Sequence, residues 1–268
     1  MYKEGFGVLY GGKTVIIDMH AHGMAPWLSY EKCEKLILEN MEKYDIDKVY
    51  VSNLYSQIPN KEEVKIANDR AYLFKKNNPE KIEGYVYISP EHDNAEYVLQ
   101  RGIEEQGFIG VKLWVSTFCN DVCVYPIMER VIEYGVPVLI HSFHKSKGQL
   151  AFETVGKHVE DLAKRYPELK IIMAHYGGNC YNGIPMIREC SNVWVDLSCS
   201  ISNGDTLDYT VENIGSDRIL FGSDMPGDYI TNVGKVLEAN LSEEDREKIF
   251  YKNTLKVFDK NFRLGASE

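Results

Sequence analysis

Two histidines separated by one residue stand out in the segment IIDMHAHG, residues 16–23. Side chains alternate along a β-strand, so His20 and His22 are expected on the same side, with Asp18 one step further back. Imidazole nitrogens and carboxylate oxygens are the usual ligands of zinc and related first-row metal ions. The pair alone is weak evidence, because one H-x-H arises often by chance and a buried histidine commonly serves packing.

Other ionisable side chains follow apolar runs elsewhere in the chain. His141 ends PVLIH, His175 ends IIMAH, Asp224 lies in LFGSDMP, and Lys112 lies inside GVKLW. In a parallel barrel, the carboxyl ends of the strands meet at one face, where active sites are built. Burying so many ionisable groups without a metal or counter-ion would be costly. Together these positions predict a metal centre.

A competing signature precedes the histidine pair. The segment GVLYGGKT, residues 7–14, matches the phosphate-loop pattern G-x-x-x-x-G-K-[ST]. A phosphate loop needs a strand before it and a helix after it, because the helix N-terminus supplies the N–H donors. Only MYKEGF precedes the pattern, and the following VIIDMHAH is typical of a strand. We therefore expect a hairpin or loop that turns at Gly11 and Gly12, at the bottom of the barrel.

The positioning elements follow from eight short apolar runs separated by amphipathic segments of helical period. The runs are residues 14–20, 48–53, 82–89, 108–114, 136–142, 169–175, 193–198 and 218–224. Alternating strands and helices predict a parallel sheet with helical crossovers, and the length suits one α/β TIM barrel, (β/α)8. We expect a single domain over residues 1–268. The segment 241–258, with Ser242 and Asp245 in a capping arrangement, is expected to be the closing helix.

Composition excludes several classes of function. The net charge of −10 disfavours a nucleic-acid partner, which requires clustered Lys and Arg. No apolar run is long enough to span a bilayer, and the six scattered cysteines argue against a disulfide framework. The N-terminus lacks the layout of a secretory signal. We expect a cytoplasmic protein that acts on a small molecule, and apolar helix faces leave a homodimer open.

These residues resemble the amidohydrolase superfamily of metal-dependent barrels. The matching pieces are IIDMHAHG, GVKLW, VLIHS, IMAHYGG and LFGSDMP, with IFYKNTLKVF similar to the closing helix. The match runs from about residue 14 to residue 260 and looks closest to a branch that mixes hydrolases and lactonases with decarboxylases. The resemblance implies metal ligation by His20, His22, His141 and Asp224, with His175 as a general acid/base or polarising group.

The number and identity of the metal ions stay open at this point. In two-metal variants of the superfamily, a carboxylated lysine bridges both ions, a role that Lys112 could fill, with His175 on the second ion. A single divalent ion is favoured because this branch often uses one; zinc is expected, with manganese or iron as alternatives. Lys112 can equally bind a substrate carboxylate or phosphate as an ammonium. Trp114 and Tyr176 are further candidates for substrate binding.

The expected reaction is hydrolysis of an amide, lactone or ester bond in a small anionic molecule. A metal-bound water would be deprotonated near neutrality, with Asp224 taking its proton and His175 assisting. The alternative is non-oxidative decarboxylation of a small aromatic or unsaturated carboxylic acid by the same ligands. A barrel that only binds ligands would be expected to lose these positions, and none of the principal ones is lost.

Overall fold

The computed structural model describes residues 15–25, 27–199, 205–226 and 228–259, and these form one parallel eight-stranded sheet in the order β1 to β8. The strands are β1 (Ile17–Ala21), β2 (Lys48–Val51), β3 (Ile82–Tyr87), β4 (Gly110–Leu113), β5 (Val138–Ile140), β6 (Ile171–Met173), β7 (Val193–Asp196) and β8 (Ile219–Leu220). Each expected run overlaps one strand that is shorter than the run, and β1 ends one residue beyond its run. The predicted (β/α)8 TIM barrel is confirmed.

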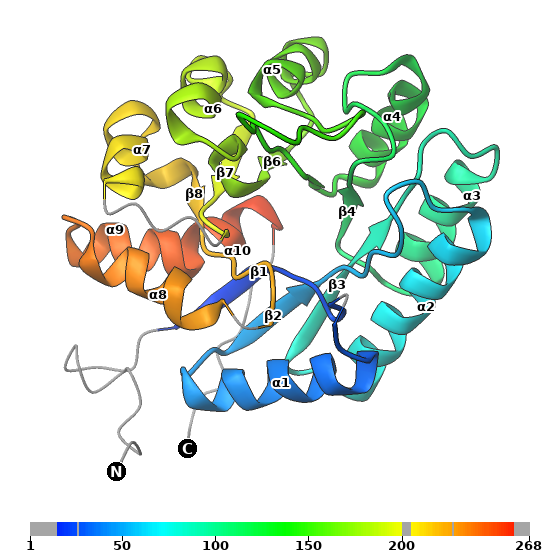
Figure 1. Cartoon of the computed structure of the whole chain (residues 1–268), viewed down its shortest axis with the longest axis horizontal. Coiled ribbons are helices and arrows are strands. Elements are labelled where there is room, and N and C mark those ends of the chain that lie inside the picture. Colours follow the sequence, from blue (N-terminus) through cyan, green and yellow to red (C-terminus); the bar gives the residue numbers. More distant parts are fainter. Residues whose placement is uncertain (1–14, 26, 200–204, 227, 260–268) are drawn as a thin grey trace.

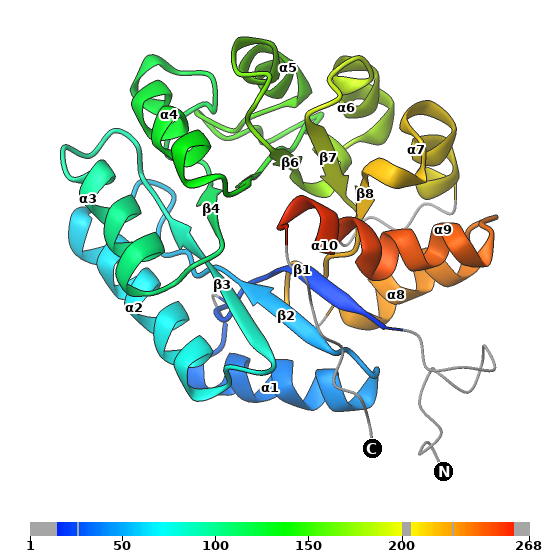
Figure 2. The same cartoon turned by 180° about the vertical axis from the view of Figure 1, so that it is seen from behind.

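Helices surround the strands as an outer ring (Figures 1 and 2). They are α1 (Tyr30–Lys43), α2 (Lys61–Asn77), α3 (Ala95–Gln100), α4 (Tyr125–Tyr134), α5 (Gly156–Arg165), α6 (Cys180–Ile187), α7 (Thr206–Ile214), α8 (Tyr229–Glu238), α9 (Glu243–Glu247) and α10 (Asn253–Val257). Helices α1 to α8 each follow the strand of the same number, which is the crossover that parallel strands require. Among the described residues, no helix has the length and apolarity needed to cross a bilayer.

The expected closing helix forms as α9 and α10, joined by a π-helical turn over Lys248–Lys252. Its N-terminus is capped as predicted, because Ser242 Oγ accepts a hydrogen bond from the Asp245 backbone N–H at 3.1 Å. The segment GVLYGGKT, for which we expected a hairpin or loop, lies outside the described residues.

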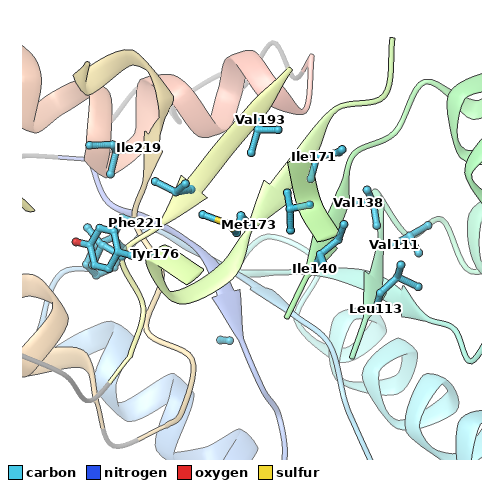
Figure 3. Close-up of a cluster of buried hydrophobic side chains, with 14 of the residues drawn as sticks. Val111, Leu113, Val138, Ile140, Ile171, Met173, Tyr176, Val193, Ile219 and Phe221 are labelled. Atoms are coloured by element: carbon cyan, nitrogen blue, oxygen red, sulfur yellow. The ribbon is translucent and has the colours of Figure 1, made fainter. Parts of the chain in front are cut away.

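Alternation along the strands divides the core into two layers. Val138 and Ile140 of β5, like Ile171 and Met173 of β6, pack outward in the layer between sheet and helices, which Figure 3 shows. Their neighbours Leu139 and Ile172 belong to the cluster inside the barrel. Phe258 joins that inner cluster, with its ring centroid 5.0 Å from that of Tyr50. The inner cluster therefore fills the end of the barrel at which Phe258 lies, and polar side chains lie at the carboxyl ends of the strands.

The first and last strands close the barrel through backbone and side-chain contacts. The Met19 N–H donates to the Phe221 carbonyl at 3.0 Å, and the His22 N–H donates to the Asp224 carbonyl at 2.9 Å. Asp18 accepts hydrogen bonds from the backbone N–H of Ser223 at 3.0 Å and from its hydroxyl at 2.6 Å. These contacts fix His20 of β1 and His22, which directly follows β1, against the segment that carries Asp224.

Candidate metal centre

Three predicted ligands converge at the carboxyl ends of β1 and β8. His22 Nε2 lies 3.2 Å from Asp224 Oδ1, and His20 Nε2 lies 3.7 Å from the same oxygen. One ligand atom from each of His20, His22 and Asp224 lies within 4.8 Å of the other two. His20 is fully buried and His22 nearly so, whereas the Asp224 side chain is partly exposed. This cluster joins residues about 200 positions apart in the sequence.

Asp18 does not share this position, although strand alternation predicts it on the same side as the two histidines. The pairing of β1 with β2 changes register between Asp18 and Ala21, so strict alternation is interrupted there. Asp18 instead bonds Ser223 and the backbone N–H of His20, the latter at 3.1 Å. Burial raises the pKa of Asp18 to about 7. Its role is to hold the backbone of the site.

The tautomers of the histidines follow from acceptors on their Nδ1 atoms. His22 Nδ1 lies 2.8 Å from the Ser52 carbonyl, and His175 Nδ1 lies 2.9 Å from the Ser198 carbonyl. A carbonyl oxygen can only accept, so each Nδ1 carries a proton, and Nε2 is the nitrogen that can offer a lone pair. His20 follows the same rule, because its Nδ1 lies 2.9 Å from the Asp196 carboxylate. Nε2 is therefore the atom through which His20 and His22 would bind a cation and through which His175 would exchange a proton.

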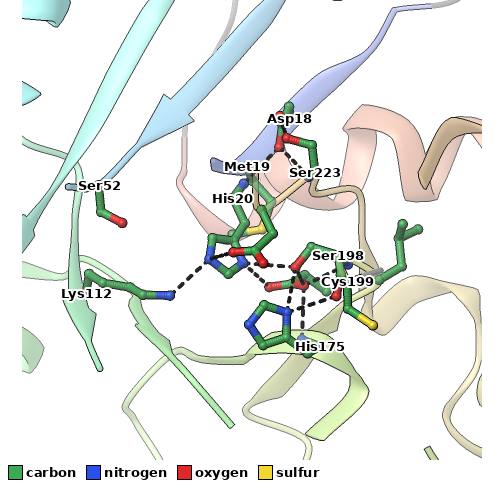
Figure 4. A network of polar contacts seen from close by, with 12 residues as sticks. Asp18, Met19, His20, Ser52, Lys112, His175, Ser198, Cys199 and Ser223 are labelled. Atoms are coloured by element: carbon green, nitrogen blue, oxygen red, sulfur yellow. Dashed lines mark hydrogen bonds and ion pairs between the residues drawn. The ribbon is translucent and has the colours of Figure 1, made fainter. Parts of the chain in front are cut away.

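Asp196 at the end of β7 organises this network; Figure 4 shows the part around His20, His175 and Ser198. Besides His20, it accepts hydrogen bonds from the backbone N–H of His175 at 3.1 Å and from the Ser198 hydroxyl at 2.5 Å. Burial alone would raise its pKa, but His20, His175 and Ser198 outweigh burial and hold the pKa below its usual range. From the sequence, substrate contact and support of a ligand were both open for Asp196, and its contacts favour support.

Backbone conformation aims His175 and Asp224 into the site. Both have positive φ, 60° and 67° respectively, which non-glycine residues rarely adopt. Tyr176, Gly177 and Gly178 continue with φ of 52°, 77° and 79°, so four consecutive residues after β6 are left-handed. Such strain is found mostly at functional sites, where surrounding contacts maintain it.

The charge of Asp224 is set by its neighbours. Burial raises the pKa of this carboxyl, but His175, His22 and His20 outweigh burial and hold the pKa well below its usual range. For His20 itself, burial and the nearby Lys112 ammonium lower the pKa to about 3. The centre thus combines an ionised carboxylate with a neutral imidazole, the protonation states that a metal ion requires of its ligands.

His141 lies beside this cluster but has a different partner. Its ring centroid is 5.1 Å from that of His175, yet its Nε2 lies 3.0 Å from Glu153 Oε1. Glu153 is buried and also accepts from Lys145 Nζ at 2.6 and 2.7 Å. Burial lowers the pKa of His141 to about 4. Ligation by His141 stays a prediction, since its Nε2 is engaged away from the other three side chains.

The two remaining substrate-binding candidates differ in their surroundings. Trp114 follows β4 and packs against the cluster of Leu54, Val64, Ala67 and Tyr87. Tyr176 is buried, and its hydroxyl has no hydrogen-bond partner among the described residues. Tyr176 also lines a pocket of about 160 Å³ together with His175 and Cys199. Contact of either side chain with a substrate stays a prediction.

A larger pocket of about 410 Å³ adjoins the centre through Asp224. His141, His175 and Asp224 contribute its polar surface. Its remaining lining is mostly apolar and comes from Ala25, Trp27, Leu28, Leu36, Phe143, Cys199, Met225 and Pro226, with Asp228. Apolar walls around a few convergent polar groups are typical of a small-molecule site.

The donor set fits a divalent metal ion. His20 and His22 offer Nε2 lone pairs, and the Asp224 carboxylate offers an anionic oxygen in the same cluster. The Nδ1 atoms of the two histidines contact Asp196 and the Ser52 carbonyl, as in metal sites where outer partners orient the ligands.

Two contributors to the site, Glu153 and the Ser52 carbonyl, were not predicted from the sequence. Glu153 comes from the irregular segment after β5, and a backbone carbonyl has no sequence signature.

Comparison with known proteins identifies relatives of lyase type. A 2-keto-4-carboxy-3-hexenedioate hydratase from Sphingobium sp. (strain NBRC 103272 / SYK-6) is 26% identical over 230 residues, covering 67% of this chain and 66% of the hydratase. A gamma-resorcylate decarboxylase from Polaromonas sp. (strain JS666 / ATCC BAA-500) is 24% identical over 241 residues, covering 68% of this chain and 72% of the decarboxylase. The chain therefore matches slightly less than two thirds of the hydratase's length.

Solved structures share the barrel. A dihydroxybenzoic acid decarboxylase from Polaromonas sp. JS666, crystallised with bound manganese and the inhibitor 2-nitroresorcinol, has a TM-score of 0.73 at 20% identity. The match covers 93% of this chain and 98% of that one. The amidohydrolase family model matches residues 17–260, which confirms the resemblance inferred from the sequence motifs. This chain belongs to the amidohydrolase family.

Proposed function

We propose that the chain is a metal-dependent lyase that removes the carboxylate of a small aromatic or unsaturated acid as carbon dioxide. The observation that carries the proposal is the convergence of His20, His22 and Asp224 at a mostly apolar pocket that Asp224 and His175 line. The two curated relatives are a hydratase and a decarboxylase. Their activities support the decarboxylase alternative better than the hydrolase that we expected first.

The pocket suits a flat acid. Trp27, Leu28, Phe143 and Pro226 provide apolar walls, while His175 and Asp224 provide polar groups at the floor. A planar ring can lie against such walls with its carboxylate directed at the polar floor. A divalent ion held by His20, His22 and Asp224, with His141 as the further expected ligand, would supply a Lewis acid for that carboxylate.

A side chain of the protein would supply the proton that replaces the carboxylate on the substrate carbon. His175, once its Nε2 has taken up a proton from solvent, would deliver that proton to the substrate carbon that bears the carboxylate. The bond from that carbon to the carboxylate breaks, its electron pair stays with the carbon as the new C–H bond forms, and carbon dioxide leaves. One proton is consumed for each carbon dioxide released. Asp196 assists indirectly, because its bond to the backbone N–H of His175 holds that residue in place.

Hydration of an unsaturated acid is the second candidate, favoured by the hydratase relative. It uses the same groups differently: one accepts a proton from water as the oxygen attacks the double bond, and another protonates the neighbouring carbon. Asp224 or His175 would take the accepting role. Both candidates need a carboxylate on the substrate and an acid/base pair at the pocket floor.

The test is turnover by purified protein loaded with Mn²⁺ or Zn²⁺. We expect carbon dioxide release from 2,6-dihydroxybenzoate or a related hydroxybenzoate, and incorporation of one deuterium at the ring carbon when the reaction runs in D₂O. Water addition to an unsaturated diacid without carbon dioxide release would favour the hydratase. If the protein hydrolysed lactones or esters and did not turn over the hydroxybenzoates or the unsaturated diacid, the lyase proposal would be overturned. Metal analysis of protein purified without chelator tests the metal centre separately.

A further inference from the structure

Lys112 is a fully buried lysine whose ammonium reaches the proposed metal centre. Its neighbours Val111 and Leu113 on β4 belong to the outward-packing layer, so strand alternation directs Lys112 into the barrel. Its Nζ lies 3.0 Å from His20 Nε2, a contact that Figure 4 shows. Among the described residues, His20 Nε2 is the hydrogen-bond partner that Lys112 Nζ has. A buried ammonium depends strongly on such a partner.

The direction of this hydrogen bond follows from the other side of the imidazole. His20 Nδ1 faces the Asp196 carboxylate at 2.9 Å, so Nδ1 carries the proton and Nε2 is the acceptor. Lys112 therefore donates to His20 Nε2. An imidazole nitrogen has one lone pair in the ring plane, and this lone pair is the one that a metal ion needs.

We infer that Lys112 and the metal ion compete for His20 Nε2, so that loading of the metal centre displaces the Lys112 ammonium. This inference rests on the proposed metal centre and concerns its occupancy. The displaced ammonium stays within the buried site, where the groups that can compensate its charge are carboxylates. The carboxylate of the proposed substrate supplies one. Metal binding should therefore precede substrate binding and strengthen it.

The competition can be measured as metal affinity in the absence of substrate. Lys112→Met replaces the ammonium by an apolar side chain of similar length, and we expect it to bind Mn²⁺ at least about tenfold more tightly than the wild type. The matched control is Lys145→Met. It removes a cation near the same site, but that cation is bonded to Glu153 rather than to a proposed ligand. We expect less than about twofold change for the control.

Each outcome of the titration decides between the possibilities. Tight Mn²⁺ binding by Lys112→Met with weak or absent binding by the wild type supports the competition. Equal affinities in both proteins overturn the competition while leaving the metal centre and the lyase proposal intact. Weaker binding by Lys112→Met also overturns it, because Lys112 would then contribute to ligation. Absence of Mn²⁺ binding in both proteins overturns the competition together with the proposed metal centre.

A second variant guards against misfolding of Lys112→Met. Lys112→Gln removes the charge but keeps a polar side chain, and it replaces Lys112→Met if circular dichroism shows that Lys112→Met does not fold.

The order of binding is tested with benzoate, a substrate-like anion that carries a carboxylate. The inhibitor 2-nitroresorcinol is not suitable, because it lacks a carboxylate. Benzoate should bind the wild type more tightly after Mn²⁺ loading, and loss of that difference in the Lys112 variant supports the displaced ammonium as its partner. If Mn²⁺ loading strengthens benzoate binding equally in the variant and the wild type, the displaced ammonium is not the partner of the carboxylate.

Discussion

Asp196 Oδ2 on β7 lies 2.9 Å from His20 Nδ1 on β1, and both side chains are fully buried. The carboxylate fixes the tautomer in which the lone pair of His20 lies on Nε2, so we expect the affinity of the proposed metal centre to depend on a residue outside the proposed ligand set.

Asp196→Asn should therefore weaken metal binding without removing a ligand. Loss of such outer partners typically costs about 10–100-fold in metal affinity, and we expect a change of that size by Mn²⁺ titration. Ser198→Ala is the comparison: it removes the hydroxyl that contacts Asp196 and His20 Nδ1 but keeps the Asp196 carboxylate, so we expect a smaller loss of affinity than in Asp196→Asn. Equal metal affinity in Asp196→Asn and the wild type would contradict this role.

Substitution of His175 and substitution of His20 should have different effects on metal content and turnover. His175→Gln is expected to retain bound metal but to lose about 10²–10⁴-fold in kcat, the usual contribution of a positioned acid or base. His20→Ala should lose the metal itself. Metal content by elemental analysis, measured beside turnover, distinguishes them. If His175→Gln also lost its metal, His175 would be a ligand, as the two-metal alternative requires.

The contacts of Glu153 predict a pH-dependent stability. Burial alone would raise the pKa of Glu153, but His141, Lys145 and the Leu150 N–H outweigh burial and lower the pKa to about 2. A carboxyl whose pKa is depressed in the folded state stabilises the protein above its unfolded pKa of about 4.5, and the contribution is lost as pH falls toward 2. Glu153→Gln should therefore be less stable than the wild type at pH 7, by about 2 kcal/mol.

Chemical denaturation at several pH values checks the sign. The difference in free energy of unfolding between wild type and Glu153→Gln should shrink as pH is lowered from 5 to 3. A difference that stays constant with pH would show that the carboxylate charge contributes nothing and that only its shape matters.

The left-handed turn after β6 gives a pair of matched substitutions. Gly178 has φ of 79°, and a Cβ there would lie 2.5 Å from the backbone nitrogen of His144. Gly148 has a similar φ of 75°, but a Cβ would meet no described atom within 4 Å. We expect Gly148→Ala to cost about 1 kcal/mol and Gly178→Ala at least about 3 kcal/mol, by thermal or chemical denaturation. Equal costs would mean that conformation, rather than crowding, limits both positions.

Much of this arrangement could be predicted from residue patterns. Strand alternation brought His20 and His22 to one side, and the rule that parallel strands end at a common face brought Asp224 to them. The same alternation misplaced Asp18, because the register of β1 shifts at that point through contacts with β2. Such irregularities depend on neighbouring strands rather than on local sequence.

Other features had no local signal. The His141–Glu153 contact joins a strand end to an irregular segment, whose path depends on tertiary packing. The glycines of HYGG indicate a turn, but nothing in that tetrapeptide indicates that His175 and Tyr176 would also be left-handed. Asp196 lay on a predicted strand end, yet its contact with His20 depends on how the two strands face each other across the barrel.

The bonds that join β1 to β8 also have a consequence for inactivation. The proposed histidine ligands lie on the β1 side of this junction and Asp224 lies on the β8 side, and the hydrogen bonds between Asp18 and Ser223 join the two sides. Fraying at this junction would separate the ligands while most of the helices remained folded. Heat should therefore abolish the enzyme's turnover before it abolishes the helical signal, and bound cation should delay the first event more than the second.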